Sequence, residues 1–237
     1  MLIPDGRVIM VSGASGGIGG AMAKCLYDKG YSISLGARTL AKLGSWVAGG
    51  DASRIMVHAY EATDPRNNAD WVNATMIQFG RIDGLINSAG MGGMVNLEDD
   101  DDETYDALWA VNVKAPMRMI RLALPHLRNS GSGRIVNVSS LSGKRVTNDG
   151  TGYALSKFAL MAVTHATRRA GWDEGVRATA LCPGWVNTDM AARAEGITRE
   201  DMIQPEDLAE MAATIIALPN GAAVAELLVS CSLGELF

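Results

Sequence analysis

The sequence has few cysteines, few aromatic residues, no excess of positive charge and no long hydrophobic run. Its three cysteines, Cys25, Cys182 and Cys231, are odd in number and far apart, which predicts reduced thiols in a cytoplasmic protein rather than a disulfide framework. The net charge of −5 argues against binding to nucleic acid or an anionic membrane. No apolar run approaches the roughly 18 residues that span a bilayer. Residues 1–7 lead directly into a strand-like segment, so a targeting peptide is not expected either.

The remaining composition is that of a folded domain. Hydrophobic residues make up 48% and charged residues 20%, which provides a core and excludes a disordered chain. The 237 residues fit one α/β domain over 1–237, in which strand-like segments alternate with segments of helical periodicity. The predicted strands are 7–11, 32–37, 55–60, 85–87, 134–139, 176–182 and 225–230, and the predicted helices are 18–29, 38–48, 65–79, 103–129, 152–172 and 205–218.

This alternation predicts a doubly wound parallel sheet with helices on both faces. Pro116 and Pro125 are expected to kink or end the helix at 103–129, because proline has no N–H and clashes with the preceding turn. The acidic run 98–103 would fit either a metal site or a solvated loop whose charges favour the positive end of the following helix. The solvated loop is preferred, because consecutive like charges point into water.

A glycine-rich turn at 12–19 joins the first predicted strand to the first helix. Gly13, Gly17 and Gly19 let the backbone turn sharply and approach a diphosphate at the N-terminus of that helix. A flexible turn would also be glycine-rich, but the position at the first strand-to-helix junction favours a dinucleotide site. No acid ends the second strand to bind a ribose 2′-hydroxyl. Arg38 stands there instead, either as a partner for a 2′-phosphate or as an ordinary surface arginine, and the first reading predicts NADP(H).

Three residues form a candidate catalytic group. Ser140 ends the fifth strand, Tyr153 follows it by thirteen residues, and Lys157 follows Tyr153 by four, which places both on one helix face. A free tyrosine has a pKa near 10, too high for efficient acid–base work at neutral pH, and a neighbouring ammonium is expected to lower that pKa. Ser140 would hydrogen-bond the substrate oxygen as charge develops on it.

Further segments complete a pattern that resembles the short-chain dehydrogenase/reductase family over nearly the whole chain. They are Ser12-Gly13-(x)3-Gly17-Ile18-Gly19, Asn87-Ser88-Ala89-Gly90, Asn112, Ser139-Ser140, Tyr153-Ala154-Leu155-Ser156-Lys157 and Pro183-Gly184-Trp185-Val186-Asn187-Thr188. The resemblance implies a Rossmann-like sheet in the order 3-2-1-4-5-6-7 and hydride transfer between NADP(H) and a carbonyl or alcohol.

The resemblance also implies roles for single residues. Tyr153 would be the general acid/base, Ser140 would bind the substrate oxygen, Lys157 would bind the ribose and modify the tyrosine pKa, and Asn112 would hold a water in a proton relay. Family members are commonly dimers or tetramers, so a homo-oligomer is expected. The implied cofactor-binding residues are Gly13, Ser15, Gly17, Ile18, Gly19, Arg38, Thr39, Glu61, Ala62, Asn87, Ala89, Gly90, Tyr153, Lys157, Pro183, Gly184, Val186 and Thr188.

Three positions depart from the family pattern. Ser88 stands where a second asparagine is usual, and Glu61-Ala62 replaces the usual Asp-Val of the adenine pocket. Gly16 stands where NADP-dependent relatives often have a basic residue. The NADP(H) prediction therefore depends on Arg38 and Thr39.

The segment 188–204 is predicted to be a short lid over the reacting carbon. With Ser140, Ser142, Tyr153, Trp185 and Met190 as substrate contacts, and Met91 and Met94 as further lining candidates, the pocket would be mainly apolar. This favours a small or medium-sized ketone, aldehyde or secondary alcohol over a steroid or carrier-bound acyl chain. Lys144, Arg145 and Arg193 would add a positive rim or, more simply, be solvated surface residues.

Other functions remain as alternatives. A non-catalytic NADP(H)-sensing regulator would not need the complete set Asn112, Ser140, Tyr153 and Lys157. A 3-oxoacyl-thioester reductase would use the same set on a larger substrate. An epimerase or dehydratase would usually have a larger C-terminal region. His58, His126 and His165 are not clustered at metal-ligand spacing and there is no G-x-S-x-G elbow, so no metal site and no serine hydrolase are predicted.

Overall fold

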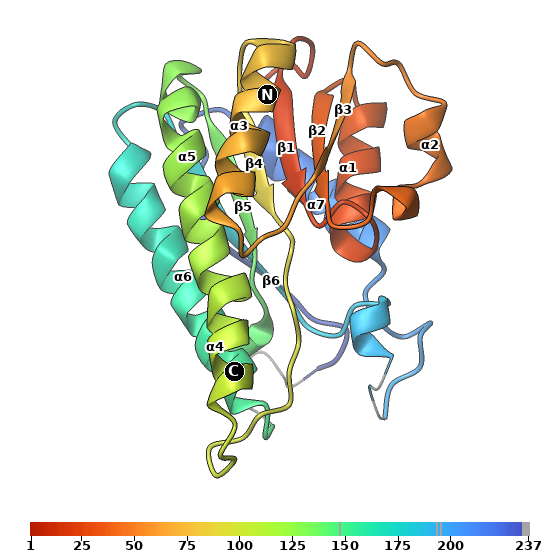
Figure 1. Cartoon of the computed structure of the whole chain (residues 1–237), viewed down its shortest axis with the longest axis vertical. Helices are drawn as coiled ribbons and strands as arrows, with labels where there is room; N and C mark the ends of the chain where they lie inside the picture. Colours follow the sequence, from red (N-terminus) through yellow and green to blue (C-terminus); the bar gives the residue numbers. More distant parts are fainter. Residues whose placement is uncertain (147, 193, 195, 234–237) are drawn as a thin grey trace.

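The computed structural model describes residues 1–146, 148–192, 194 and 196–233, and it forms three layers with a sheet between two layers of helices (Figure 1). Seven strands pair in parallel in the order β3-β2-β1-β4-β5-β6-β7, which confirms the predicted fold and strand order. The strands are β1 (Val8–Ser12), β2 (Ser32–Ala37), β3 (Ile55–Ala59), β4 (Gly84–Asn87), β5 (Arg134–Val138), β6 (Arg177–Pro183) and β7 (Glu226–Val229).

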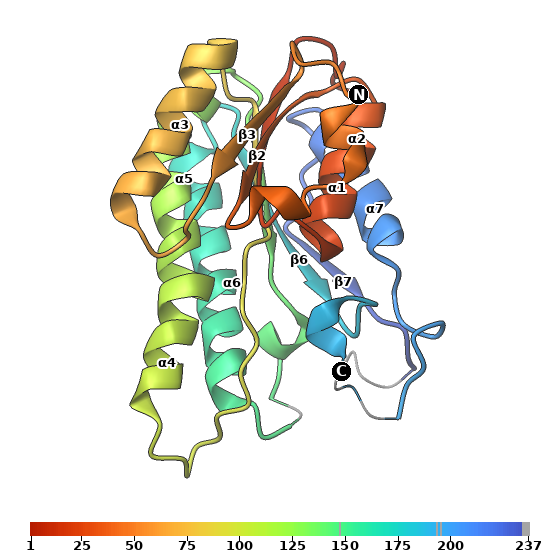
Figure 2. The same cartoon turned by 45° about the vertical axis from the view of Figure 1, so that its right-hand side comes forward.

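Alternate side chains of the strands form two cores, one on each face of the sheet. Ile9 and Val11 of β1 pack with α1 (Gly17–Asp28) and α7 (Pro205–Ala217). Met10, between them, points the other way and packs with α3 (Pro65–Phe79) and α5 (Ala115–Asn129). Figure 2 shows α3, α4 (Asp102–Trp109), α5 and α6 (Thr151–Gly171) on one side of the sheet and α1, α2 (Ser45–Ala48) and α7 on the other.

The helix predicted after the second strand is mostly absent. Residues 38–48 contain a 3₁₀ turn at Leu40–Lys42 and then only the four residues of α2. Glycine lowers helix stability by about 1 kcal/mol relative to alanine, and Gly44, Gly49 and Gly50 limit the helix on both sides. The segment is held instead by Leu43, Trp46 and Val47, which pack against the α1 core.

The long helix predicted at 103–129 is interrupted by a π turn at Ala110–Lys114. Pro116 cannot donate the i→i−4 hydrogen bond, and the N–H of Ala115 already bonds five residues back to the carbonyl of Ala110. The turn therefore lies where proline was expected to disturb the helix. Pro125, by contrast, does not end α5, in which the buried residues Ala123 and Leu127 pack on either side of it.

Side-chain caps begin two of the helices. The Asp64 carboxylate accepts hydrogen bonds from the backbone N–H groups of Arg66 and Asn67 at the start of α3. Asp101, in the acidic run, accepts from the N–H of Thr104 at 3.0 Å, and the residues of the run are exposed. The acidic run is thus a solvated, helix-capping loop. Within the described ranges, no helix combines the length and apolar character required to cross a membrane.

Candidate active site

The glycine-rich turn after β1 has a backbone that only glycine fits. Gly13 has φ +71°, and a Cβ built on it would lie 2.8 Å from the backbone nitrogen of Ala89. A Cβ on Gly19 would lie 2.5 Å from the carbonyl oxygen of Gly13. The Ser12 hydroxyl accepts from the N–H groups of Ser88 and Ala89 at 3.1 Å, which ties this turn to the one after β4. The two turns therefore form one rigid edge.

The N-terminus of α1 opens from this edge. Its N-cap is Gly16, which makes no side-chain capping bond, and the first turn contains no acidic residue. The first N–H groups of the helix and its positive dipole end are thus available to an anion. Gly17 has φ +54°, and a Cβ on it would lie 3.2 Å from the Thr188 methyl group. Ser15 and Ile18 are half-buried beside it. These residues fit a diphosphate, as predicted from the spacing.

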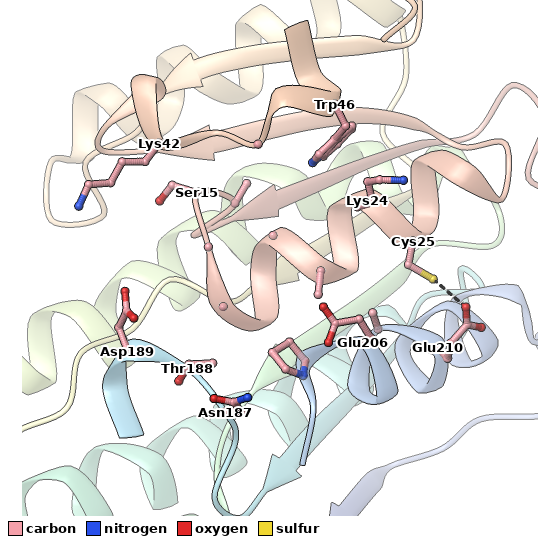
Figure 3. Close-up of a pocket in the computed structure, with 18 of the residues that line it drawn as sticks. Ser15, Lys24, Cys25, Lys42, Trp46, Asn187, Thr188, Asp189, Glu206 and Glu210 are labelled. Carbon is pink, nitrogen blue, oxygen red and sulfur yellow. Dashed lines mark hydrogen bonds between the residues drawn. The ribbon is translucent and has the colours of Figure 1, made fainter. Parts of the chain in front are cut away.

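A cavity of about 730 Å³ adjoins this turn (Figure 3). The predicted residues Ser15, Gly17 and Thr188 line it. Sequence reasoning missed its other polar side chains, because they come from the irregular segment after β2, from α1 and α7, and from the predicted lid. They are Lys24, Cys25, Asp28, Lys42, Trp46, Asn187, Asp189, Arg199, Glu206 and Glu210.

The predicted lid is fastened at both ends. Val186 and Ile203 form a parallel β-bridge. Arg199 donates to the Asn187 side-chain oxygen and to the Thr188 carbonyl, each at 2.9 Å, and the Asn187 amide donates to Gln204. This network fixes Thr188 against Gly17. Arg193 and Glu195, within the predicted lid, lie outside the described residues.

The catalytic side chains meet where β5 ends and α6 begins. Ser140 follows β5, and its hydroxyl accepts from the N–H of Ser142 at 3.1 Å and lies near enough to Tyr153 to act on the pKa of that phenol. Lys157 lies one turn after Tyr153 on α6, and its Nζ is 5.5 Å from the centre of the tyrosine ring. The ammonium is buried and donates to the Val138 carbonyl at 3.0 Å. The structure thus brings the predicted trio together.

The pKa of Tyr153 does not shift in the direction we expected. Lys157 was expected to lower it, but burial raises the tyrosine pKa above its usual value, and the hydrogen bond from Ser140 offsets only part of this rise. Burial also lowers the pKa of Lys157 to about 8. The physical reason is the same for both groups. Burial removes water from the phenolate of Tyr153 and from the ammonium of Lys157, and no neighbouring carboxylate stabilises the ammonium in return. In this state Tyr153 keeps its proton at neutral pH.

Asn112 lies in the π turn, and its side chain is occupied by protein groups. Its amide nitrogen donates to the Met91 carbonyl at 2.9 Å and to the Ser156 hydroxyl at 3.0 Å, while its oxygen accepts from the Met91 N–H at 3.0 Å. Both amide hydrogens are thus used, and the side-chain oxygen keeps one acceptor position for the predicted relay water. Gly90 leaves room for both side chains, because a Cβ added at this position would lie 3.3 Å from the Asn112 side-chain oxygen and 3.8 Å from the Lys157 Nζ.

A buried polar chain beneath the site was not predicted. The Asn87 amide donates to the Asn137 oxygen at 2.8 Å, and the Asn137 amide donates to the Thr164 hydroxyl at 2.9 Å, which joins β4, β5 and α6. All three residues are buried. Asn87 ends β4 and Asn137 lies near the end of β5, and their positions in the sequence do not signal this pairing, because it depends on strand order.

The predicted adenine-side residues lie apart from the cavity lining. Arg38 and Thr39 are exposed at the end of β2. Glu61 is exposed and accepts from the Thr63 N–H and hydroxyl, and Ala62 is buried, with its carbonyl accepting from Arg118.

Two of the predicted substrate residues, Trp185 and Met190, are exposed to solvent. Trp185 is 39% exposed and Met190 is 58% exposed. Met190 of the lid approaches the turn after β4, since a Cβ on Gly92 would lie 3.6 Å from its Cγ. Pro183 and Gly184 close β6, and the Gly184 N–H donates to the Val229 carbonyl. Lys144 is not free at the rim, because it pairs with Glu226 at 2.7 Å.

Comparison with known proteins decides the family. The family model for short chain dehydrogenases matches residues 7–196. This chain belongs to the short chain dehydrogenase family. Among curated relatives of this dehydrogenase, an agropine synthesis reductase of Rhizobium rhizogenes is 47% identical over 231 residues, which are 97% of this chain and 53% of the relative. The dehydrogenase chain therefore spans about half the length of that relative. An uncharacterized oxidoreductase of Staphylococcus saprophyticus is 31% identical and is matched over 96% of its length.

Solved structures show the same architecture. An alcohol dehydrogenase of the archaeon Thermococcus sibiricus, complexed with 5-hydroxy-NADP, superposes with a TM-score of 0.84 at 26% identity, covering 94% of this chain and 95% of that one. A metagenomic short-chain oxidoreductase in complex with NADP gives a TM-score of 0.83 at 30% identity, covering 97% and 99%. The fold of this chain therefore agrees with these structures along nearly its whole length.

Proposed function

We propose that this dehydrogenase is an NADP(H)-dependent reductase of small carbonyl compounds, with Tyr153 as the general acid. The observation that carries the proposal is the assembled group of Ser140, Tyr153 and Lys157 at the carboxyl edge of the sheet, where ligands of open α/β sheets bind. The named relatives support it, since one is called a reductase and two solved structures contain NADP or a derivative.

The side chains would act as follows. When bound, the nicotinamide cofactor supplies the hydride. The Ser140 hydroxyl orients the substrate oxygen beside the Tyr153 hydroxyl, which donates its proton as negative charge develops on that oxygen. Because burial raises the pKa of Tyr153, the group holds the proton that reduction needs at neutral pH. Lys157, buried but charged below about pH 8, stabilises the phenolate that remains.

The cofactor and substrate proposals rest on different residues. The glycine turn and the α1 N-terminus suit the diphosphate, and the absence of an acid at Ala37 together with Arg38 favours a 2′-phosphate. For the substrate, Trp185 and Met190 would provide an apolar wall beside the polar Ser142. A small ketone, aldehyde or hydroxy acid therefore suits the site better than a steroid or a 3-oxoacyl thioester.

Two further proposals concern assembly and location. Leu155 and Phe158 of α6 and Met117 of α5 are 50%, 41% and 39% exposed, and these apolar side chains support a homo-oligomer, dimeric or tetrameric, packed through the two helices. The three unpaired cysteines support a reducing compartment such as the cytoplasm.

The test is NADPH oxidation with a panel of carbonyl compounds in the wild type and Tyr153→Phe. The variant keeps the ring but loses the proton, so turnover should fall by about 10²–10⁴-fold while NADPH still binds. Near-normal turnover in Tyr153→Phe would refute the mechanism. NADPH binding by a wild type that turns over no substrate would favour the sensing regulator instead.

A further inference from the structure

Building on the proposed use of NADP(H), we propose that Lys42 and Ser15 form a binding site for the 2′-phosphate. The usual family positions do not complete such a site in this chain. Gly16 provides no charge before Gly17, and Arg38, which is exposed as Lys42 also is, does not line the cavity beside the phosphate turn. Lys42 does line that cavity, together with Ser15.

The short segment that carries Lys42 is held in place against α1. Its N–H bonds to the Thr39 carbonyl at 3.1 Å, and that of Leu43 bonds to Leu40. Trp46 then packs on Tyr27 of α1, with ring centroids 5.5 Å apart. This packing explains why Lys42, five residues beyond the end of β2, reaches the cavity although no regular helix forms there.

Lys42 is a cation with no assigned partner. Among the described residues, its ammonium makes no ion pair and no hydrogen bond, whereas Lys24 in the same cavity is paired with Asp28 at 2.6 Å. Figure 3 shows Lys42 and Ser15 together at one end of the cavity, by the glycine turn, and Lys24 away from them, along α1. The ammonium and the Ser15 hydroxyl together offer the charge and the short hydrogen-bond donor that a phosphate dianion binds.

The diphosphate and the 2′-phosphate would thus be bound by different means. The first is bound by backbone N–H groups at the α1 N-terminus, and these do not distinguish NADPH from NADH. The second is bound by side chains from both sides of the cavity mouth. Discrimination between the two cofactors is therefore expected to depend on Lys42 at least as much as on Arg38.

Calorimetric titration with adenosine 2′,5′-bisphosphate and with 5′-AMP tests this without turnover. Lys42→Ala should weaken binding of the bisphosphate by about ten- to a hundred-fold and leave 5′-AMP binding within about twofold. Lys42→Arg should restore most of the loss, and the effect should shrink at high salt. Ser15→Ala should cause a smaller selective loss. Lys29→Ala, at a lysine that pairs with Glu210 at 2.9 Å and does not line the cavity, is the matched control and should change neither ligand.

Selective loss of the bisphosphate in Lys42→Ala supports the site. Unchanged bisphosphate affinity in Lys42→Ala, with the loss confined to Arg38→Ala, would overturn it while leaving NADP(H) use intact. An equal loss for both ligands would also overturn it, because that pattern indicates a structural effect. A wild type that binds the two ligands equally would refute the cofactor choice itself, and the inference with it.

Discussion

The nucleotide-binding half of this dehydrogenase, β1–β3 with α1, and its catalytic half, β4–β6 with α5 and α6, build their sites from different materials. In the first half the site is mainly backbone: glycines at positive φ, free N–H groups and exposed cations at the mouth. In the second it is mainly buried side chains, namely Asn112, Ser140, Lys157 and the chain Asn87–Asn137–Thr164. The first site therefore depends on backbone shape. The second depends on hydrogen bonds that offset the cost of removing polar side chains from water.

Substituting Lys157 should separate function from stability in the catalytic half. Lys157→Met removes the charge that the proposed mechanism needs, so turnover should fall by at least about 10²-fold. Burying the ammonium costs about 3 kcal/mol for a pKa lowered from 10.5 to about 8. Lys157→Met removes this cost but also loses the hydrogen bond to the Val138 carbonyl, which contributes about 1 kcal/mol. The variant should therefore be more stable and unfold at a higher temperature in calorimetry. A destabilised Lys157→Met would contradict the desolvation argument.

Adding one methyl group should harm the nucleotide-binding half through shape alone. Gly13→Ala requires a positive φ and places a Cβ 2.8 Å from the Ala89 nitrogen, so we expect a loss of about 2–4 kcal/mol in the free energy of unfolding. Gly16→Ala, with φ 169° and nothing within 4 Å of its Cβ, is the control and should change stability by less than about 0.5 kcal/mol. Equal denaturant midpoints for the two variants would show that the turn is less rigid than described.

A pH profile sharpens the comparison further. Lys157 loses its charge as pH rises through about 8, so kcat/KM for reduction should fall above that pH. Stability should move the other way. The unfolded chain keeps this proton up to about pH 10.5, so between about pH 8 and 10.5 the unfolded state binds more protons, and rising pH stabilises the fold. This contribution should vanish in Lys157→Met, measured as the difference between the two stability curves.

The smallest expected effect lies outside both halves of the site. Asp101→Ala removes the cap of α4 and should cost about 1 kcal/mol without changing turnover or cofactor affinity. Asp100, exposed in the same acidic run, provides the control, because within the described chain its side chain makes no hydrogen bond. If Asp100→Ala were as destabilising as Asp101→Ala, the effect would come from net charge rather than from capping.

Much of the molecule could be read from the sequence because the deciding interactions are local. Strand and helix order follows from periodicity, and the place of the phosphate turn follows from Gly13, Gly17 and Gly19 at one strand-to-helix junction. The i, i+4 spacing of Tyr153 and Lys157 already puts them on one helix face. The cap at Asp64 and the disturbance at Pro116 likewise depend on neighbours within one turn.

Only the tertiary structure decided the properties that depend on burial and on partners far along the chain. The direction of the Tyr153 pKa shift is set by desolvation, which outweighs the hydrogen bond from Ser140. The pairing of Asn87 with Asn137 follows from strand order, and the occupation of the Asn112 amide follows from how Met91 and Ser156 pack around it. Glycines limit the helix expected at 38–48 to four residues. Packing of Trp46 against α1 then places Lys42 at the cavity, a position that spacing along the chain does not specify.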